Sequence, residues 1–362
     1  VGAVDSLEKA IFFCKTRMNN SQEIVKGETP LEIMEFISKE TLLSQLYGMY
    51  ESYWHAILWN NFDLIEVDQE NKLYIIEQPM DQYEIGAYVS QIRKSRLGGQ
   101  SAIIATRPDI LRFYENDKYI SIVKSGRKNK LICKDIKKSD DEIKALNSDW
   151  KTKTLFLVDN FGTDILSTQN NIGFSINEAL EIFRNLIILS VISTNKYPND
   201  TGVFNLKRLS EFCPKVNKVQ LQLTLNKSTG ISIDKVIKIL KFLEYQASEN
   251  QDLWCHPIIN ISPQQYALVT SSLVTPVILR VVEHWLVSLN IELQGKGLVY
   301  EKLIIDGMNS ALDENPTILD FDNAISRRIK LTNAEEEIDL ILRIGNLILI
   351  GEAKSIVTTD SP

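Results

Sequence analysis

The sequence has few cysteines: only four in 362 residues, widely spaced, with no Cys-x-x-Cys pair. Zinc sites in proteins usually need four converging ligands, so this spacing argues against one. Cys255 and His256 are neighbours, but the sequence places no two further ligands close to them. We therefore expect buried or idle thiols in the reduced state, and a cytoplasmic protein.

Long apolar runs and an excess of positive charge are also missing. The longest apolar runs, 186–191 and 273–289, are too short or are broken by Arg280, Glu283 and His284, so no membrane span is expected. No signal-peptide pattern opens the sequence. The net charge is −7, which does not suit a polybasic protein that coats nucleic acid, so any such contact must be local. The sequence shows no repeats and no low-complexity segments.

The length predicts two or three domains with ordinary apolar cores. The predicted fold class is mixed α/β (α+β), divided into an N-terminal α+β region of unknown role (1–160), a mostly helical region with a short hairpin (161–294) and a C-terminal unit (295–362). We expect the chain to be part of a longer protein.

The first region predicts helices and two hairpins. A capping box at Thr29–Glu32 opens a helix that continues to residue 60 with an aromatic face, which we expect to be core. Residues 62–67 and 72–78 predict one hairpin, and 119–123 and 130–136 a second, joined by a lysine-rich turn. A helix over 83–97 carries Arg93, Lys94 and Arg96 in its last turn. These cations complement the helix dipole or contact phosphate, and the same alternatives apply to Arg127 and Lys128 in the turn.

The middle region predicts more helix than strand. A capping box at Ser175–Glu178 opens a helix through 193, and lysines mark the outer face of a helix over 235–245. The alternation of helix, short strand and helix is compatible with a winged-helix-like module. The remaining predicted elements are a buried strand (155–158), a short helix (205–212), a strand (218–225), a hairpin (257–261 with 266–270), a long helix (273–289) and a hinge (295–297).

Residues 337–354 carry the most specific pattern, two apolar strands joined by Gly345-Asn346. Glycine at the first central position is what a two-residue type II′ turn requires, so Ile344 should pair with Leu347. The same register places Asp339 opposite Glu352, with their Cβ atoms about 4.5–5.5 Å apart. Two carboxylates this close in an apolar hairpin require a proton or a cation between them. Lys354 projects from the same face as Glu352, so the pattern predicts a chemical site.

The elements before this hairpin extend the pattern. Residues 298–312 predict a helix with Glu301 at the edge of its apolar stripe, and 318–324 and 328–331 predict one or two strands. Both faces of the hairpin are apolar, so we expect it in the middle of a sheet flanked by helices. The earlier hairpin offers a contrast, because Asp63 and Glu77 have similar spacing but Gln78-Pro79 follows without a lysine.

A helix with glutamate (GKGLVYEKLI), an aspartate at the head of a strand (EEEIDLIL) and Glu-x-Lys at the end of the next (GEAKS) resemble the PD-(D/E)xK, or restriction-endonuclease-like, nuclease superfamily. The resemblance covers about the last seventy residues. It implies an αβββαβ core, here truncated after Lys354, that cuts nucleic acid with Mg²⁺ or Mn²⁺. In that reading Asp339, Glu352 and Glu301 are metal-ligand carboxylates and Lys354 is the motif lysine. Ile338 stands where the superfamily name has proline.

The prediction is therefore a metal-dependent endonuclease acting on nucleic acid, DNA rather than RNA. Its N-terminal region would recognise substrate or partners or restrain cleavage, with a role in bacterial defence against foreign DNA. The alternatives are an inactive nuclease-like scaffold or nucleic-acid-binding subunit, and a charged cluster satisfied by pairing alone. A protein partner or a homo-oligomer is compatible with each.

Overall fold

A computed structural model describes residues 3–19, 29–59, 62–77, 117–125, 128–137, 139–195, 197, 212–248, 251–291, 294–315, 317–318, 320–330 and 335–351. Within these ranges it is a mixed structure of helices and small antiparallel sheets, as predicted. No described helix combines the length and the apolar character that a membrane span requires. The predicted helix at 83–97 and the short helix at 205–212 lie outside the described residues, apart from residue 212.

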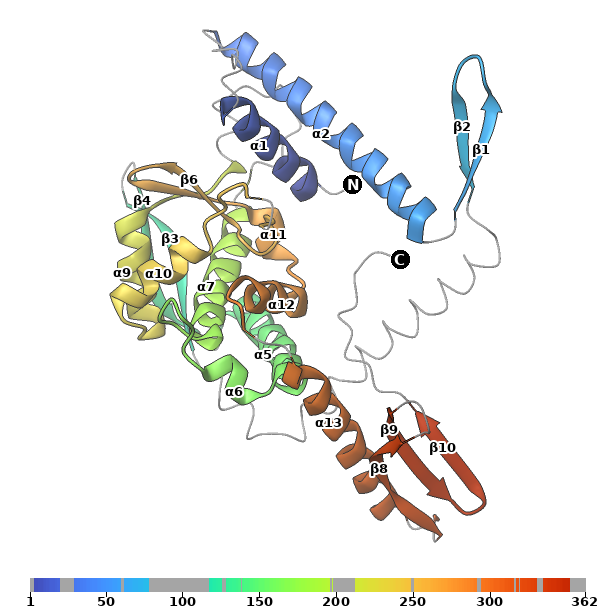
Figure 1. Cartoon of the computed structure of the whole chain (residues 1–362). Coiled ribbons are helices and arrows are strands. Elements are labelled where there is room, and N and C mark those ends of the chain that lie inside the picture. The colour runs from blue at the N-terminus through green and yellow to red at the C-terminus, as the bar shows by residue number, and fades with distance from the viewer. Residues whose placement is uncertain are drawn as a thin grey trace.

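The chain opens with helices α1 (Ala3–Asn19) and α2 (Pro30–Trp59), which pack against each other (Figure 1). The predicted capping box is present, because the Thr29 and Glu32 side chains each accept a hydrogen bond from the other's backbone amide. The expectation that the aromatic face of α2 is core is wrong. Tyr50 is 71% exposed, and Trp54 is exposed as well. This helix is apolar on most sides and α1 covers only part of it, where Phe13 meets Tyr47 in an edge-to-face contact.

Helix α1 is fastened to a loop far along the chain. Glu8 accepts a hydrogen bond from the Leu253 amide and Asp5 accepts one from the Trp254 indole, each at 2.9 Å. The Lys15 ammonium donates to backbone carbonyls of the same loop. Burial raises the pKa of the Glu8 carboxyl. These polar contacts fix the N-terminal helix to the loop that precedes β6.

Two hairpins follow. The first pairs β1 (Asp63–Asp68) with β2 (Leu73–Glu77), and the second pairs β3 (Lys118–Ser125) with β4 (Lys128–Asp135). Both predictions are confirmed. The second hairpin has a shorter tip than expected, because Ser125 pairs directly with Lys128.

Helices α5 (Asp141–Phe161) and α6 (Thr163–Ser167) come next. The predicted buried strand at 155–158 is wrong, because this segment is the last third of α5. The buried residues Trp150, Leu157 and Phe161 recur at helical spacing. The apolar residues at 155–158 belong to a helix. The helical period becomes visible only when the buried residues from Trp150 to Phe161 are considered together.

Helix α7 (Ile176–Thr194) lies among α5, α9, α10 and α11 in the main body (Figure 1). Its predicted capping box at Ser175 and Glu178 is confirmed. It packs against β3, α5, α9, α10 and α11, and most of its residues are buried. The main hydrophobic core surrounds it and extends from Ile120 to Leu289, on both sides of residue 160.

A six-element unit includes α7 as its first helix. The other elements, in chain order, are β5 (Lys215–Asn217), α9 (Lys218–Thr229), α10 (Ile233–Phe242), β6 (Ile258–Ser262) and β7 (Gln265–Leu268). The three strands form one antiparallel sheet in the order β5-β7-β6. This succession and strand order match the topology of a winged-helix module, in which β6 and β7 form the wing.

The predicted strand at 218–225 is wrong, because this segment begins α9. Alternating polar and apolar residues suggest a strand, but the buried side chains, Leu221, Leu225 and Ser228, are spaced as on a helix. The Asn217 side chain caps the helix by accepting from the Gln220 amide. The predicted amphipathic helix and the hairpin that follows it are confirmed as α10 and as β6 with β7.

The predicted long helix at 273–289 is two helices, α11 (Thr270–Val274) and α12 (Ile278–Ser288). Pro276 separates them, because proline disfavours helical backbone at the residue before it. Thr275 accordingly has φ −128° and ψ 51°.

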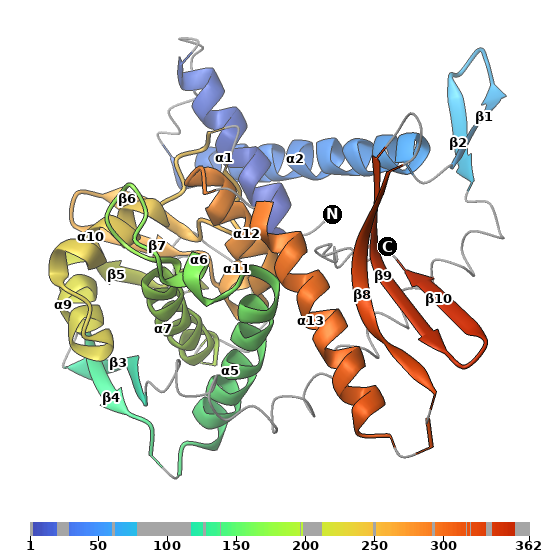
Figure 2. The same ribbon diagram turned by 60° about the horizontal axis from the view of Figure 1, so that its bottom comes forward.

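The C-terminal unit consists of α13 (Gln294–Asp313), β8 (Phe321–Lys330), β9 (Glu335–Ile344) and β10 (Leu347–Gly351). The sheet order is β10-β9-β8, and α13 packs on β8 and β9 (Figure 2). The predicted hinge at 295–297 is wrong, because these residues form the first turn of α13. The one or two strands predicted at 318–324 and 328–331 are the single strand β8.

The predicted register of the last hairpin is confirmed in every described pair. Ile344 pairs with Leu347, and the ladder continues to Leu340 opposite Gly351. Gly345 has φ +57°, whereas Asn346 is not among the described residues with positive φ. This is the pattern of a type II′ turn. The turn therefore sets the pairing that the sequence predicts.

Arg184 on α7 generates a first prediction. Its side chain is 1% exposed and donates to the Lys118 carbonyl (2.7 Å), to Asn147 Oδ1 (3.0 Å) and to Glu181 (2.6 Å). It thereby joins β3 and α5 to α7. We expect Arg184→Leu to lower the free energy of unfolding by roughly 3–5 kcal/mol, because it leaves buried acceptors without a donor. Urea unfolding followed by circular dichroism measures this.

Lys153→Leu is the control, because Lys153 pairs with Asp149 on the exposed side of α5. We expect a change of at most about 1 kcal/mol for this exposed pair. Equal effects of the two substitutions would show that Arg184 does not hold the three elements together.

Two glycines of the C-terminal unit give a second, paired prediction. Gly345→Ala forces a side chain into a left-handed backbone and should destabilise the unit by roughly 1–2 kcal/mol. Gly307 lies within α13, where an added Cβ would meet nothing within 4 Å, so Gly307→Ala should stabilise it by roughly 1 kcal/mol. Hydrogen exchange of the β9 amides reports both changes. Protection that moves in the same direction in both variants would contradict the turn assignment.

Candidate active site

Asp339 lies on β9 and is half-buried. Leu340, Leu342 and Ile344 of the same strand pack in a cluster with α13. Because side chains alternate along a strand, Asp339 and Ile341 project from the opposite face of the sheet. The face that carries Asp339 is therefore not the one covered by α13.

Glu301 lies on α13, about one turn before Ile305, the first residue of this helix in the cluster with the sheet, and is also half-buried. The helix brings its backbone to the side of the sheet that carries Leu340 and Leu342. The structure thus places the two described carboxylates on elements that pack together, α13 and β9.

Glu352 and Lys354 lie outside the described residues, one and three positions after the end of β10. The same holds for Arg93, Lys94, Arg96 and Arg127. Only the backbone of Lys128 is described, where it pairs with Ser125. The described structure therefore establishes the pairing of β9 with β10 as far as Leu340, the neighbour of Asp339. The positions of Glu352, Lys354 and the basic side chains remain sequence predictions.

The expectation that helices cover both faces of the last hairpin is wrong for the described residues. In β10, Ile350 is 70% exposed and Ile348 61% exposed on one face, and Leu347 and Leu349 are exposed on the other. Strand β10 is an edge of a three-stranded sheet, and α13 packs on β8 and β9. The apolar sequence pattern shows that both faces of β10 could be covered by other elements. It does not show whether such an element is present.

Arg343 lies at the turn end of β9, four residues after Asp339. Its guanidinium donates to Asp322 (2.7 Å), to Asp320 (2.9 Å) and to the Gly345 carbonyl (2.8 Å). The hydrogen bonds from Arg343 lower the pKa of the Asp322 carboxyl. These carboxylates are exposed and paired, so this cluster is a brace for the turn that sets the register.

The hairpin β1–β2 repeats the opposed acids without the lysine. Asp63 pairs directly with Glu77, and both are exposed. Opposed carboxylates in water can separate by rotating their side chains. This hairpin is an internal reference for the C-terminal pattern.

The sequence prediction that Cys255 lacks further ligands nearby is wrong. Asp252, Cys255 and His284 offer ligand atoms that all lie within 4.8 Å of one another. Thiolate, imidazole and carboxylate suit Zn²⁺ rather than Mg²⁺. His284 comes from α12, twenty-nine positions away from Cys255, so no local spacing in the sequence could have shown this cluster.

Of the three side chains in this cluster, that of Cys255 is buried and those of Asp252 and His284 are partly exposed. Burial raises the pKa of the Cys255 thiol and lowers the pKa of neighbouring His256 to about 4. Asp252 already accepts hydrogen bonds from the Cys255 amide (2.7 Å) and from Arg280 (3.4 Å). The cluster of Asp252, Cys255 and His284 is one ligand short of a closed zinc site. These residues belong to other elements than the predicted Mg²⁺ ligands, which lie on α13 and β9.

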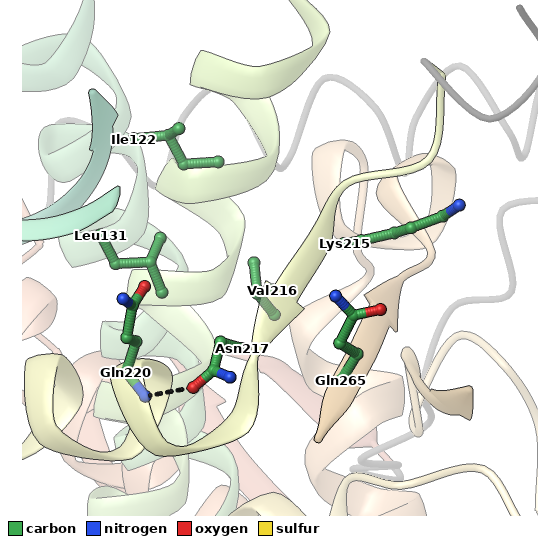
Figure 3. A pocket seen from close by; sticks show the side chains of 7 residues that line it. All are labelled: Ile122, Leu131, Lys215, Val216, Asn217, Gln220 and Gln265. Atoms are coloured by element: carbon green, nitrogen blue, oxygen red, sulfur yellow. Dashed lines mark hydrogen bonds between the residues drawn. The ribbon is translucent and has the colours of Figure 1, made fainter. Parts of the chain in front are cut away.

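A cavity of about 480 Å³ lies between the β3–β4 hairpin and the start of α9 (Figure 3). Ile122, Leu131 and Val216 form its apolar wall, and the amides of Asn217, Gln220 and Gln265 with Lys215 form the polar one. Figure 3 shows Asn217 Oδ1 accepting from the Gln220 backbone amide, so this side-chain oxygen of the polar wall already caps α9. Among the described residues, the lining contains no carboxylate, cysteine or histidine.

The chain was compared with families and with individual proteins. No protein-family model, no curated protein and no solved structure matches it.

Proposed function

We propose that the C-terminal unit is a Mg²⁺-dependent nuclease that hydrolyses phosphodiester bonds of DNA. The observation that carries the proposal is the pairing of β9 with β10. Its register, described as far as Leu340 opposite Gly351, is the one from which the sequence predicts Asp339 opposite Glu352.

The order of elements supports the proposal. A helix followed by three antiparallel strands, α13-β8-β9-β10, is the first part of the αβββαβ core that the resemblance implies. The helix packs on one face of this sheet, and Asp339 projects from the other. A DNA phosphate could approach the carboxylate from that face without displacing α13.

The donor set suits Mg²⁺, which prefers hard oxygen ligands and is usually held by one or two carboxylates together with water and substrate phosphate. Asp339 and Glu352 would hold the ion, with Glu301 as a further carboxylate from α13. When bound, the metal ion supplies charge neutralisation and a more acidic water. Lys354 would orient the attacking water or stabilise the negative charge that develops on the phosphate. The first three hundred residues would select the substrate or restrain cleavage, which would suit defence against foreign DNA.

Incubation of the full chain with linear and supercoiled DNA, and with RNA, in Mg²⁺ or Mn²⁺ tests the proposal. We expect cleavage of DNA that is abolished by Asp339→Asn and by Glu352→Gln, because each removes a metal ligand. Lys354→Met should slow cleavage roughly 100-fold, since it removes one charge-stabilising group. Glu301→Gln, measured separately, decides whether the carboxylate of α13 contributes.

The matched control is Asp63→Asn with Glu77→Gln in the β1–β2 hairpin, which has the same opposed acids without the lysine. We expect full activity from it. Calorimetry should show Mg²⁺ binding that disappears in Glu352→Gln. Cleavage that survives Asp339→Asn would refute the assignment. Absence of both cleavage and metal binding would favour a non-catalytic scaffold or nucleic-acid-binding subunit.

A further inference from the structure

Helices α9 and α10 form a helix-turn-helix. Three residues, Gly230, Ile231 and Ser232, join the end of α9 to the start of α10. Gly230 adopts the left-handed conformation (φ +74°), and the Asn226 side chain donates to the Ile231 carbonyl at 2.7 Å. A short turn with glycine between two helices is the arrangement that presents a second helix to the major groove of DNA.

Helix α10 keeps one face inside the core and presents the other to solvent. Val236, Ile239 and Leu240 are fully buried. The outer face carries Asp234, Ile237, Lys238 and Lys241, and each of these side chains is exposed. The helix has ten residues and is therefore about 15 Å long. An α-helix with its side chains is about 10–12 Å in diameter, so α10 fits a major groove about 12 Å wide.

The charge of this surface is opposite to that of the whole chain. The chain carries a net charge of −7, whereas Lys238 and Lys241 lie one turn apart on the outer face of α10. Lys235 does not add to this surface, because its ammonium pairs with Glu178 at 2.6 Å. The two exposed lysines match a DNA backbone, since lysine contacts to phosphates supply most of the sequence-independent affinity.

The remaining exposed groups of α10 suit base edges. In a helix-turn-helix the N-terminal residues of the second helix contact the bases. Here these positions hold Asp234, whose carboxylate can accept from the cytosine amino group, and Ile237, which is 42% exposed and can contact a thymine methyl. This explains the single acidic residue on an otherwise basic and apolar face.

The wing lies beside the start of α9. The Lys218 amide donates to the Gln264 carbonyl at 3.0 Å, and its ammonium donates to Asn260 Oδ1 at 2.8 Å. These bonds hold the tip of the β6–β7 hairpin against the first helix of the motif. In helix-turn-helix proteins that first helix crosses the DNA backbone, so the wing and α9 provide a second line of contact.

From these observations we propose that the α7–β7 unit binds duplex DNA, with α10 in the major groove and Lys238 and Lys241 on the phosphates. The proposal does not depend on the nuclease chemistry of the C-terminal unit.

Fluorescence anisotropy of the full chain with a labelled 30-base-pair duplex tests the proposal, in buffer containing EDTA so that no cleavage occurs. We expect binding that weakens steeply between 50 and 200 mM salt. Lys238→Gln with Lys241→Gln should lower the affinity roughly 10- to 100-fold. The plot of log K against log salt should become shallower by about two, because each substitution removes one lysine from the phosphates.

The matched control is Lys144→Gln on α5, which removes the same charge from a lysine paired with Asp141 and should leave the affinity unchanged. Both lysines of α10 are exposed, so thermal unfolding should not change. If the double variant unfolds, the single variants should each reduce the slope by about one.

Three results would overturn the proposal. They are an unchanged affinity in the double variant, binding confined to single strands or RNA, and self-association of the chain through α10 without DNA binding, detected by sedimentation and removed by Ile237→Lys. The nuclease proposal fails separately: duplex binding without cleavage in Mg²⁺ refutes only the nuclease, and cleavage with unchanged binding in the double variant refutes only this surface.

Discussion

The burial of α7 is the constraint on which the rest of the main body depends. Most of its nineteen residues are buried, including apolar side chains on several sides, so neighbours must surround it. Its one buried guanidinium, on Arg184, has to be satisfied inside that core, and the acceptors come from β3, α5 and α7 itself. Burial of the apolar side chains of α7 brings the neighbouring elements together. The hydrogen bonds that Arg184 needs determine which residues of these elements come into contact. The helix-turn-helix packs on this support through α9 and α10.

The sequence predicts correctly the features that local chemistry determines. Both capping boxes, the three described hairpins outside the C-terminal unit and the pairing across Gly345-Asn346 depend on a few neighbouring residues, and the structure confirms them. In each case one side chain or one backbone angle decides the conformation. Asp339 could therefore be placed on its strand in the correct register, although the partners predicted for it lie outside the described residues.

The errors arise where the decision depends on distant contacts. Residues 155–158 and 218–225 are short apolar or alternating segments, which suit a strand until the longer helical spacing of buried side chains is seen. The second error conceals the helix-turn-helix, because a strand at 218–225 would leave α10 without its first helix. The cluster of Asp252, Cys255 and His284 is formed by the packing of α12 on the loop before β6, and the exposure of α2 and β10 depends on what covers them.

The attachment of α1 has a consequence for the order of events during synthesis. Its contacts to the loop at 246–254 join residues more than 230 positions apart. At about 5–20 residues per second, the ribosome needs roughly 12–46 s to make the second half of this contact after the first. For that time α1 cannot settle on the body, and the tyrosines and tryptophan of α2 are presented to the cell without the folded body behind them. Helices α1 and α2 are therefore made before the loop that α1 contacts and are positioned late. A chaperone that binds apolar helices would meet them before that loop exists.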